Sequence, residues 1–260
     1  MLKPISIKIM FLSIVIALTV INCNKRTSPI IIGHRGAMGH VTENTLESVQ
    51  KAMDLDVDGI EIDIFKCKSG ELVVFHDKNL SRLTDSNGLI ESLDLDSIKK
   101  IRLQKKYIIP TLTEVLDLVG GKVFLNIELK GSETAILTNQ LIKKYIEKGN
   151  WTSEKFIISS FNWLELEKFY EINKDVPIAV LTDADPLDAL PIAEKLNAKA
   201  INPSYKSLNP KNVKKIHKAG YKVYPYTVNS KEKISKIISL NVDGIITDYP
   251  ERVSEIIKNP

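Results

Sequence analysis

The stretch that decides the fold is GIEIDIF, residues 59–65. Side chains alternate along a β-strand, so Ile60, Ile62 and Ile64 share one face while Glu61 and Asp63 share the other. A central strand of a parallel sheet is normally apolar on both faces, because helices cover such sheets on both sides. We therefore expect the isoleucines to pack under helices and both carboxylates to point inward. The alternative is a strand whose polar face lies in solvent.

Apolar runs of strand type recur along the chain, and most are followed by a segment with helical spacing of apolar residues. This β/α alternation is typical of a parallel sheet, and eight repeats predict a closed (β/α)8 barrel of roughly 250 residues. An open doubly wound sheet is the structural alternative. No break in composition indicates a second domain. The predicted strands are Ile30–Gly33, Gly59–Phe65, Val123–Leu129, Phe156–Ser160, Ile178–Leu181, Ala200–Ile201, Lys222–Tyr226 and Gly244–Thr247.

The second β/α unit is interrupted. Glu71–Phe75 follows the second strand after a Lys68-Ser69-Gly70 turn, which predicts a hairpin. Residues 78–110 then form an insertion before a helical pattern resumes at Thr111. The carboxyl ends of barrel strands carry the active site, so the insertion is a candidate cap or specificity element.

The first 22 residues resemble an export signal. Met1–Lys8 carries two lysines and Ile9–Val20 is almost wholly apolar, too short to span a bilayer as a mature helix. Residues 20–23 resemble a bacterial lipoprotein processing box, which makes Cys23 the expected lipid attachment site. We thus expect a signal peptide at 1–22, a tether at 23–29, a barrel domain at 30–258, and an exported protein held on a membrane in the periplasm or at the cell surface. An uncleaved anchor and ordinary secretion are the alternatives.

Charge excludes one class of partner. The net charge is +4, and removing Lys3 and Lys8 with the signal lowers it to +2. That is no electrostatic footprint for nucleic acid. The lysines at 211–218 are expected to be a solvated helix face. With Cys23 lipidated, Cys67 would have no partner for an intramolecular disulfide.

A second strand repeats the pattern of inward polar residues. In Asn126–Lys130, Asn126, Glu128 and Lys130 point one way while two apolar residues point the other. Glu61 and Asp63, about 7 Å apart along their strand, would then meet Glu128 from a neighbouring strand. Three carboxylates make an all-oxygen site suited to Ca²⁺ or Mg²⁺. The alternative for Glu128 and Lys130 is a structural ion pair.

Two histidines lie where barrel strands end. His34 follows the first strand and His76 follows the Leu72–Phe75 run. Histidine titrates near neutral pH, so the pair can serve as acid and base. Arg35 offers a planar fork that matches phosphate oxygens. His40 lies in the turn and is expected to be a bystander.

Taken together, these segments resemble the glycerophosphodiester phosphodiesterase family. The matching motifs run in order over nearly the whole mature chain. They are His34-Arg35-Gly36, Glu43-Asn44-Thr45, Glu61-Ile62-Asp63, His76-Asp77, Arg82-Leu83-Thr84, Ile109-Pro110-Thr111-Leu112, Glu128-Leu129-Lys130, Ser159-Ser160-Phe161, and Gly244–Pro250.

The resemblance implies a TIM barrel that hydrolyses glycerophosphodiesters to sn-glycerol 3-phosphate and an alcohol. It implies that Glu61, Asp63 and Glu128 bind one divalent cation, that His34 and His76 are the acid/base pair, and that Arg35 and Lys130 contact phosphate. Two departures are visible: Thr42 replaces the usual proline before Glu43, and Tyr226 stands where tryptophan is common. The second bears on the wall that receives the glycerol or the alcohol.

Three readings remain open from the sequence: a glycerophosphodiesterase, a lipid-directed enzyme of lysophospholipase D or sphingomyelinase D type, and a non-catalytic surface-binding lipoprotein. The sequence leaves the ion, the head group and the oligomeric state open. It also allows attack either by the glycerol 2-hydroxyl or by water.

Overall fold

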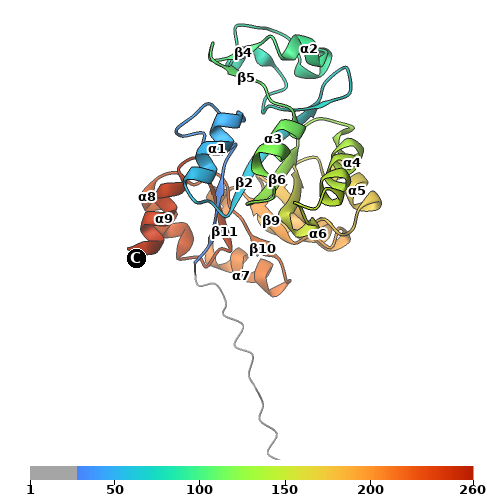
Figure 1. The fold of residues 1–260 in the computed structure, drawn as a ribbon. Coiled ribbons are helices and arrows are strands. Elements are labelled where there is room, and N and C mark those ends of the chain that lie inside the picture. The colour runs from blue at the N-terminus through green and yellow to red at the C-terminus, as the bar shows by residue number, and fades with distance from the viewer. Residues whose placement is uncertain (1–27, 260) are drawn as a thin grey trace, which may run out of the picture.

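Residues 28–259 are described by a computed structural model. Parallel strands form a barrel in the order β10-β9-β8-β7-β6-β2-β1-β11, surrounded by helices (Figure 1). This confirms the predicted TIM (β/α)8 barrel. The barrel strands are β1 (Ile30–Gly33), β2 (Gly59–Lys66), β6 (Phe124–Leu129), β7 (Phe156–Ser160), β8 (Ile178–Thr182), β9 (Ala200–Pro203), β10 (Lys222–Val223) and β11 (Gly244–Thr247).

Backbone hydrogen bonds join the last two strand segments and close the barrel. The N–H of Asp243 donates to the carbonyl of Val223 at 3.0 Å, and the N–H of Ile246 donates to that of Pro225 at 3.0 Å. The N–H of Val228 returns to the carbonyl of Ile246 at 3.0 Å. An open doubly wound sheet leaves its two edge strands unpaired, so that alternative is wrong.

The predicted inward and outward faces of β2 are confirmed. Ile60, Ile62 and Ile64 are fully buried in a large apolar cluster shared with the surrounding helices. The helices that cover the barrel are α1 (Leu46–Asp54), α3 (Leu112–Val119), α4 (Thr134–Glu147), α5 (Trp163–Ile172), α6 (Leu190–Lys195), α7 (Pro210–Lys218), α8 (Lys231–Ile238) and α9 (Pro250–Lys258). A smaller apolar cluster that includes Ile32, Ile157 and Tyr224 fills the barrel interior.

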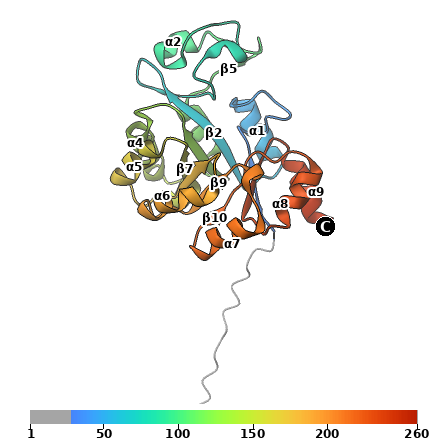
Figure 2. The same cartoon turned by 180° about the vertical axis from the view of Figure 1, so that it is seen from behind.

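The interruption after β2 is a small layer with its own core. Strand β3 (Leu72–Val74) pairs antiparallel with β2, as the predicted hairpin requires. The insertion, residues 78–110, lies above the barrel at the end to which β2 runs (Figures 1 and 2). Phe75, Leu80 and Ile98 belong to its buried core. Its elements are η1 (Leu80–Arg82), η2 (Ile90–Ser92), α2 (Leu95–Ile98), β4 (Arg102–Leu103) and β5 (Tyr107–Ile108).

The start of β1 lies at the end of the barrel opposite the insertion (Figure 1). The predicted signal peptide, Cys23 and most of the tether lie outside the described residues, and their assignment stays a prediction. Within residues 28–259, no helix is both long and apolar enough to cross a bilayer.

Candidate active site

A cavity of about 450 Å³ opens at the carboxyl ends of the barrel strands. It is lined by six of the seven residues predicted to act in the site: His34, Arg35, Glu61, His76, Glu128 and Lys130. The seventh, Asp63, is 1 % exposed and contacts both Arg35 and Lys130. Loops at this end of a barrel are the usual location of catalysis, since side chains from different strands converge there.

Three carboxylates converge in this cavity. Asp63 on β2 is the register partner of Glu128 on β6, and Glu61 lies two residues before Asp63 on the same face. One oxygen of each lies within 4.8 Å of the others, and all three residues are buried. A solvent-facing strand, the alternative considered for β2, is therefore wrong.

The electrostatics of the cluster favour a bound cation. Burial, followed by the neighbouring carboxylates, raises the pKa of Glu61 well above its ordinary value. Burial and Asp63 likewise raise the pKa of Glu128 to about 7. One oxygen of Glu61, Oε1, is buried without a hydrogen-bond partner in the described chain. Buried like charges are costly unless paired or bound to a metal, so this donor set fits a hard divalent cation.

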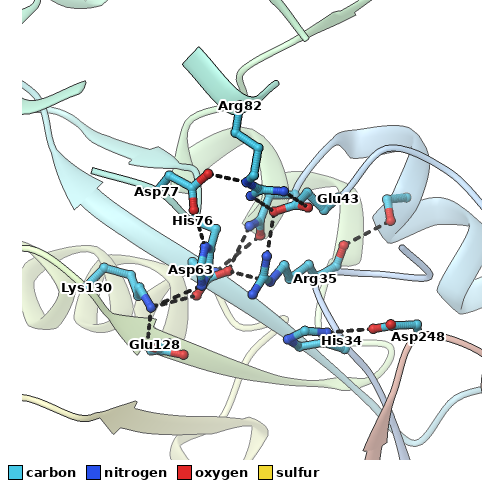
Figure 3. Close-up of polar contacts among 12 residues, drawn as sticks. His34, Arg35, Glu43, Asp63, His76, Asp77, Arg82, Glu128, Lys130 and Asp248 are labelled. Carbon is cyan, nitrogen blue, oxygen red and sulfur yellow. Dashed lines mark hydrogen bonds and ion pairs between the residues drawn. The ribbon is translucent and has the colours of Figure 1, made fainter. Parts of the chain in front are cut away.

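Two cationic side chains partly balance the carboxylates. Lys130 Nζ lies 2.9 Å from Glu128 Oε1 and 3.8 Å from Asp63 Oδ1. Arg35 Nε lies 3.3 Å from Asp63 Oδ2. The ion pair expected as the alternative role of Glu128 and Lys130 thus exists, but it lies inside the cavity, where Lys130 is also available to a ligand (Figure 3).

The backbone at Arg35 is in a conformation that few non-glycine residues adopt, with φ of 50°. Its N–H donates to Glu61 Oε2 at 2.9 Å, and its guanidinium donates to Glu43 Oε1 at 2.6 Å. Strained residues of this kind persist where the surroundings hold them, often at functional sites. With this backbone conformation, the guanidinium of Arg35 lies beside the carboxylate cluster.

Each of the two catalytic candidates His34 and His76 is held by an aspartate at its Nδ1 atom. His34 Nδ1 lies 2.7 Å from Asp248 Oδ1, and His76 Nδ1 lies 2.6 Å from Asp77 Oδ1 (Figure 3). An aspartate on Nδ1 orients an imidazole and leaves Nε2 for proton transfer. Burial lowers the pKa of His76, and Lys130 Nζ lies 3.3 Å from its Nε2.

Several supporting residues lay within the motifs but had no predicted role. Glu43 accepts hydrogen bonds from Arg82 at 2.8 and 2.7 Å, and Arg82 also pairs with Asp77. Asn44 donates to Asp63 Oδ2 at 2.8 Å. Their place after predicted strands was a signal that they lie near the site. Their partners could not be predicted, because the contacts bridge separate loops.

The remaining two histidines do not line the cavity, as was expected for His40. His40 Nε2 lies 3.0 Å from Glu251 Oε2 and outside the cavity lining. His217 pairs with Asp243 at 2.8 Å on the far helix layer. The lysines of α7 are exposed, which confirms the predicted solvated face; they are Lys211, Lys214, Lys215 and Lys218.

One wall of the cavity combines aromatic rings with an acid. Tyr226 lies with its hydroxyl 2.7 Å from Asp183 Oδ1 and 3.0 Å from the carbonyl of Thr182. Its ring meets Phe161 edge-on at 5.8 Å between centroids. Asp183 was missed by sequence reasoning, because it belongs to a loop without a recognisable motif.

The chain is similar to known proteins in both sequence and fold. Residues 34–252 match the glycerophosphoryl diester phosphodiesterase family. A glycerophosphodiester phosphodiesterase of Caldanaerobacter subterraneus is 36 % identical, over 88 % of this chain and 98 % of the relative. One of Bacillus subtilis is 30 % identical, over 88 % and 86 %.

A solved Oleispira antarctica phosphodiesterase, in complex with the product sn-glycerol-3-phosphate, superposes with a TM-score of 0.80 at 29 % identity. The superposition covers 89 % of this chain and 98 % of the solved chain. The match therefore extends over nearly the full barrel in both sequence and structure. The chain belongs to the glycerophosphoryl diester phosphodiesterase family and is an enzyme that hydrolyses glycerophosphodiesters.

Proposed function

We propose that the enzyme releases sn-glycerol 3-phosphate and an alcohol, with His34 and His76 as the acid/base pair and one divalent cation as cofactor. The observation that carries the proposal is the placement of two aspartate-held imidazoles in one cavity with a buried carboxylate cluster. A single histidine or a single acid would have many structural explanations. Their joint convergence supports general acid–base hydrolysis.

Glu61, Asp63 and Glu128 would hold the cation, and Ca²⁺ and Mg²⁺ both suit an all-oxygen set. When bound, such an ion supplies Lewis-acid stabilisation of phosphoryl oxygens and lowers the pKa of a nearby hydroxyl. The unpartnered oxygen of Glu61 and the raised pKa values of Glu61 and Glu128 support this role.

Arg35 and Lys130 would bind the phosphodiester. A phosphodiester anion resists attack, so preorganised positive charge at its oxygens stabilises the transition state. The planar fork of Arg35 suits two oxygens, while Lys130 offers a point charge. Both side chains are already held by carboxylates, which limits the conformational entropy lost on binding.

Each histidine would present Nε2 to the substrate because its Nδ1 is engaged by aspartate. One takes a proton from the nucleophile and the other gives a proton to the leaving alkoxide. We favour the glycerol 2-hydroxyl as nucleophile, giving a cyclic phosphate that water then opens. Direct attack by water is the competing route. Rapid quench in oxygen-18 water separates them, because failure to trap any cyclic phosphate contradicts the preferred route.

The enzyme is further proposed to be exported and lipid-anchored through Cys23. The export pattern of residues 1–22 and the processing-box pattern at residues 20–23 support this proposal. Metabolic labelling with a radioactive fatty acid, lost in Cys23→Ser, tests the anchor.

The decisive experiment is a substrate panel with metal titration. Glycerophosphocholine should be hydrolysed, EDTA should abolish the reaction, and Ca²⁺ or Mg²⁺ should restore it. Full activity in EDTA would show that the reaction needs no divalent cation and would contradict the proposed cofactor. Faster release of head group from intact lysophosphatidylcholine than from glycerophosphocholine would instead favour a lysophospholipase D, and binding without turnover would favour a binding protein.

A further inference from the structure

The wall formed by Phe161, Asp183 and Tyr226 is chemically unlike the rest of the cavity. Arg35, Lys130 and the histidines suit an anion, whereas this wall places a carboxylate beside two aromatic rings. The three residues follow the carboxyl ends of β7, β8 and β10, respectively. Such a wall would repel a phosphate and attract a positively charged group.

The carboxylate of Asp183 is fixed in place while remaining accessible. The Tyr226 hydroxyl holds its Oδ1 at 2.7 Å, and the Phe161 ring supports the Tyr226 ring edge-on. Asp183 itself is exposed and lines the cavity. Within residues 28–259, no cationic side chain forms an ion pair with Asp183, so its charge acts on whatever occupies the cavity.

The wall adjoins the phosphate-binding end of the site. Lys130 Nζ lies 5.8 Å from the centroid of the Phe161 ring and 3.3 Å from His76 Nε2. A phosphodiester bound at Lys130 would therefore extend one of its two ester groups along Phe161 toward Asp183.

We propose that this wall receives the alcohol part of the substrate and selects an alcohol that carries a positive charge, such as choline or ethanolamine. The inference rests on the proposed function and deepens it by naming the substrate class. Aromatic faces attract quaternary ammonium groups through the ring quadrupole, and Asp183 adds a full negative charge. A neutral glycerol could donate a hydrogen bond to Asp183, but it would gain no cation–π attraction from the rings.

The test compares glycerophosphocholine with glycerophosphoglycerol, which has a neutral head group, in the metal-loaded full-length enzyme. The wild type should prefer glycerophosphocholine in kcat/KM. Asp183→Asn should lower that preference by about fivefold, mainly by raising KM for the choline substrate. Asp188→Asn, which removes an exposed carboxylate five residues later and outside the cavity lining, should leave the ratio unchanged.

A second variant tests the same wall without removing the Asp183 carboxylate. Tyr226→Phe keeps the ring and removes the hydroxyl that holds Asp183, so it should lower the preference in the same direction by a smaller factor. If Asp183→Asn slowed both substrates equally, the wall would bind the shared glycerol and the inference would be wrong. A ratio unchanged in Asp183→Asn would overturn it as well.

Failure of the proposed function is distinguishable from failure of this inference. If the wild type hydrolysed neither substrate, the proposed function would fall. Binding of tetramethylammonium, followed by NMR titration, would then still report on the wall. Binding that Asp183→Asn weakens and Asp188→Asn does not supports the inference, and the absence of binding to the wild type contradicts it.

Discussion

His34 Nδ1 lies 2.7 Å from Asp248 Oδ1, although 214 positions separate the two residues in the chain. The contact exists because β1 and β11 are neighbouring parallel strands and both residues follow their carboxyl ends. Asn229 donates to the other oxygen of Asp248 at 2.6 Å, so the carboxylate itself is held. The orientation of a proposed catalytic histidine thus depends on barrel closure.

Asp248→Asn should lower kcat by at least about tenfold with little change in KM, because the amide disturbs the orientation and tautomer of His34 without removing a substrate contact. Steady-state kinetics on glycerophosphocholine measures this. Glu251→Gln is the matched control, because it alters a histidine–carboxylate pair outside the cavity. Equal effects of the two substitutions would show that the His34–Asp248 contact is structural.

His76→Ala should lower kcat by about 100- to 10,000-fold while the circular dichroism spectrum stays unchanged. The imidazole is only partly buried, so its removal leaves no large cavity in the core. His40→Ala should retain wild-type turnover. Wild-type kcat in His76→Ala would show that the acid/base assignment is wrong.

Glu61→Gln should weaken cation binding. In the wild type, saturating Ca²⁺ or Mg²⁺ should raise the melting temperature, since a ligand bound only by the folded state stabilises it. The variant should melt no lower than the wild type in EDTA, because its buried like charges are reduced, yet respond less to the cation. Glu171→Gln, on an exposed face of α5, should respond as the wild type does. An undiminished response in Glu61→Gln would contradict the cation site.

Arg82→Ala should lower kcat/KM by about tenfold or more, since Arg82 joins the insertion to both Glu43 and Asp77. Those carboxylates hold Arg35 and His76 respectively, so both phosphate binding and proton transfer should suffer. Arg102→Ala offers a control on the same insertion, because the Arg102 guanidinium donates to the carbonyls of Lys99 and Ile101 and to neither Glu43 nor Asp77. A wild-type kcat/KM in Arg82→Ala would mean that the contacts of Arg82 are not needed to position the site.

Glu165→Gln should destabilise the fold by about 1–2 kcal/mol at pH 7. Glu165 is 1 % exposed, accepts the N–H groups of Thr134 and Ala135 at 3.2 and 3.3 Å, and pairs with Lys168 at 2.8 Å. Burial raises the pKa of Glu165, but Lys168 and the backbone N–H groups outweigh it, and the net shift is downward.

A depressed folded-state pKa means that the stabilisation is complete above the ordinary carboxyl pKa of 4.5 and is lost as the pH falls through the folded value. Urea unfolding at pH 7 and at acidic pH should therefore show a difference between wild type and Glu165→Gln that shrinks in acid. The exposed Glu171→Gln should show little difference at either pH. A gap that grew in acid would contradict the sign of the shift.

Strand periodicity predicted most of the barrel but misjudged one strand. Lys222–Tyr226 was expected to be a strand, and only Lys222–Val223 is one. The following residues bond instead to β11 and to Pro203 as the chain bends to close the barrel. Local hydrophobic pattern carries no information on that bend, because the partner strand is distant in sequence.

The sequence by itself determined the barrel and its inward carboxylates, because alternation along a strand is a local property that burial enforces. Glu61, Asp63 and Glu128 could be assigned to one site before any contact was known. Only the tertiary structure decided the pairings of His34 with Asp248, Arg82 with Glu43 and Tyr226 with Asp183. Each pairing joins loops of different β/α units, so it depends on how the barrel closes and how the insertion docks, which no local spacing encodes.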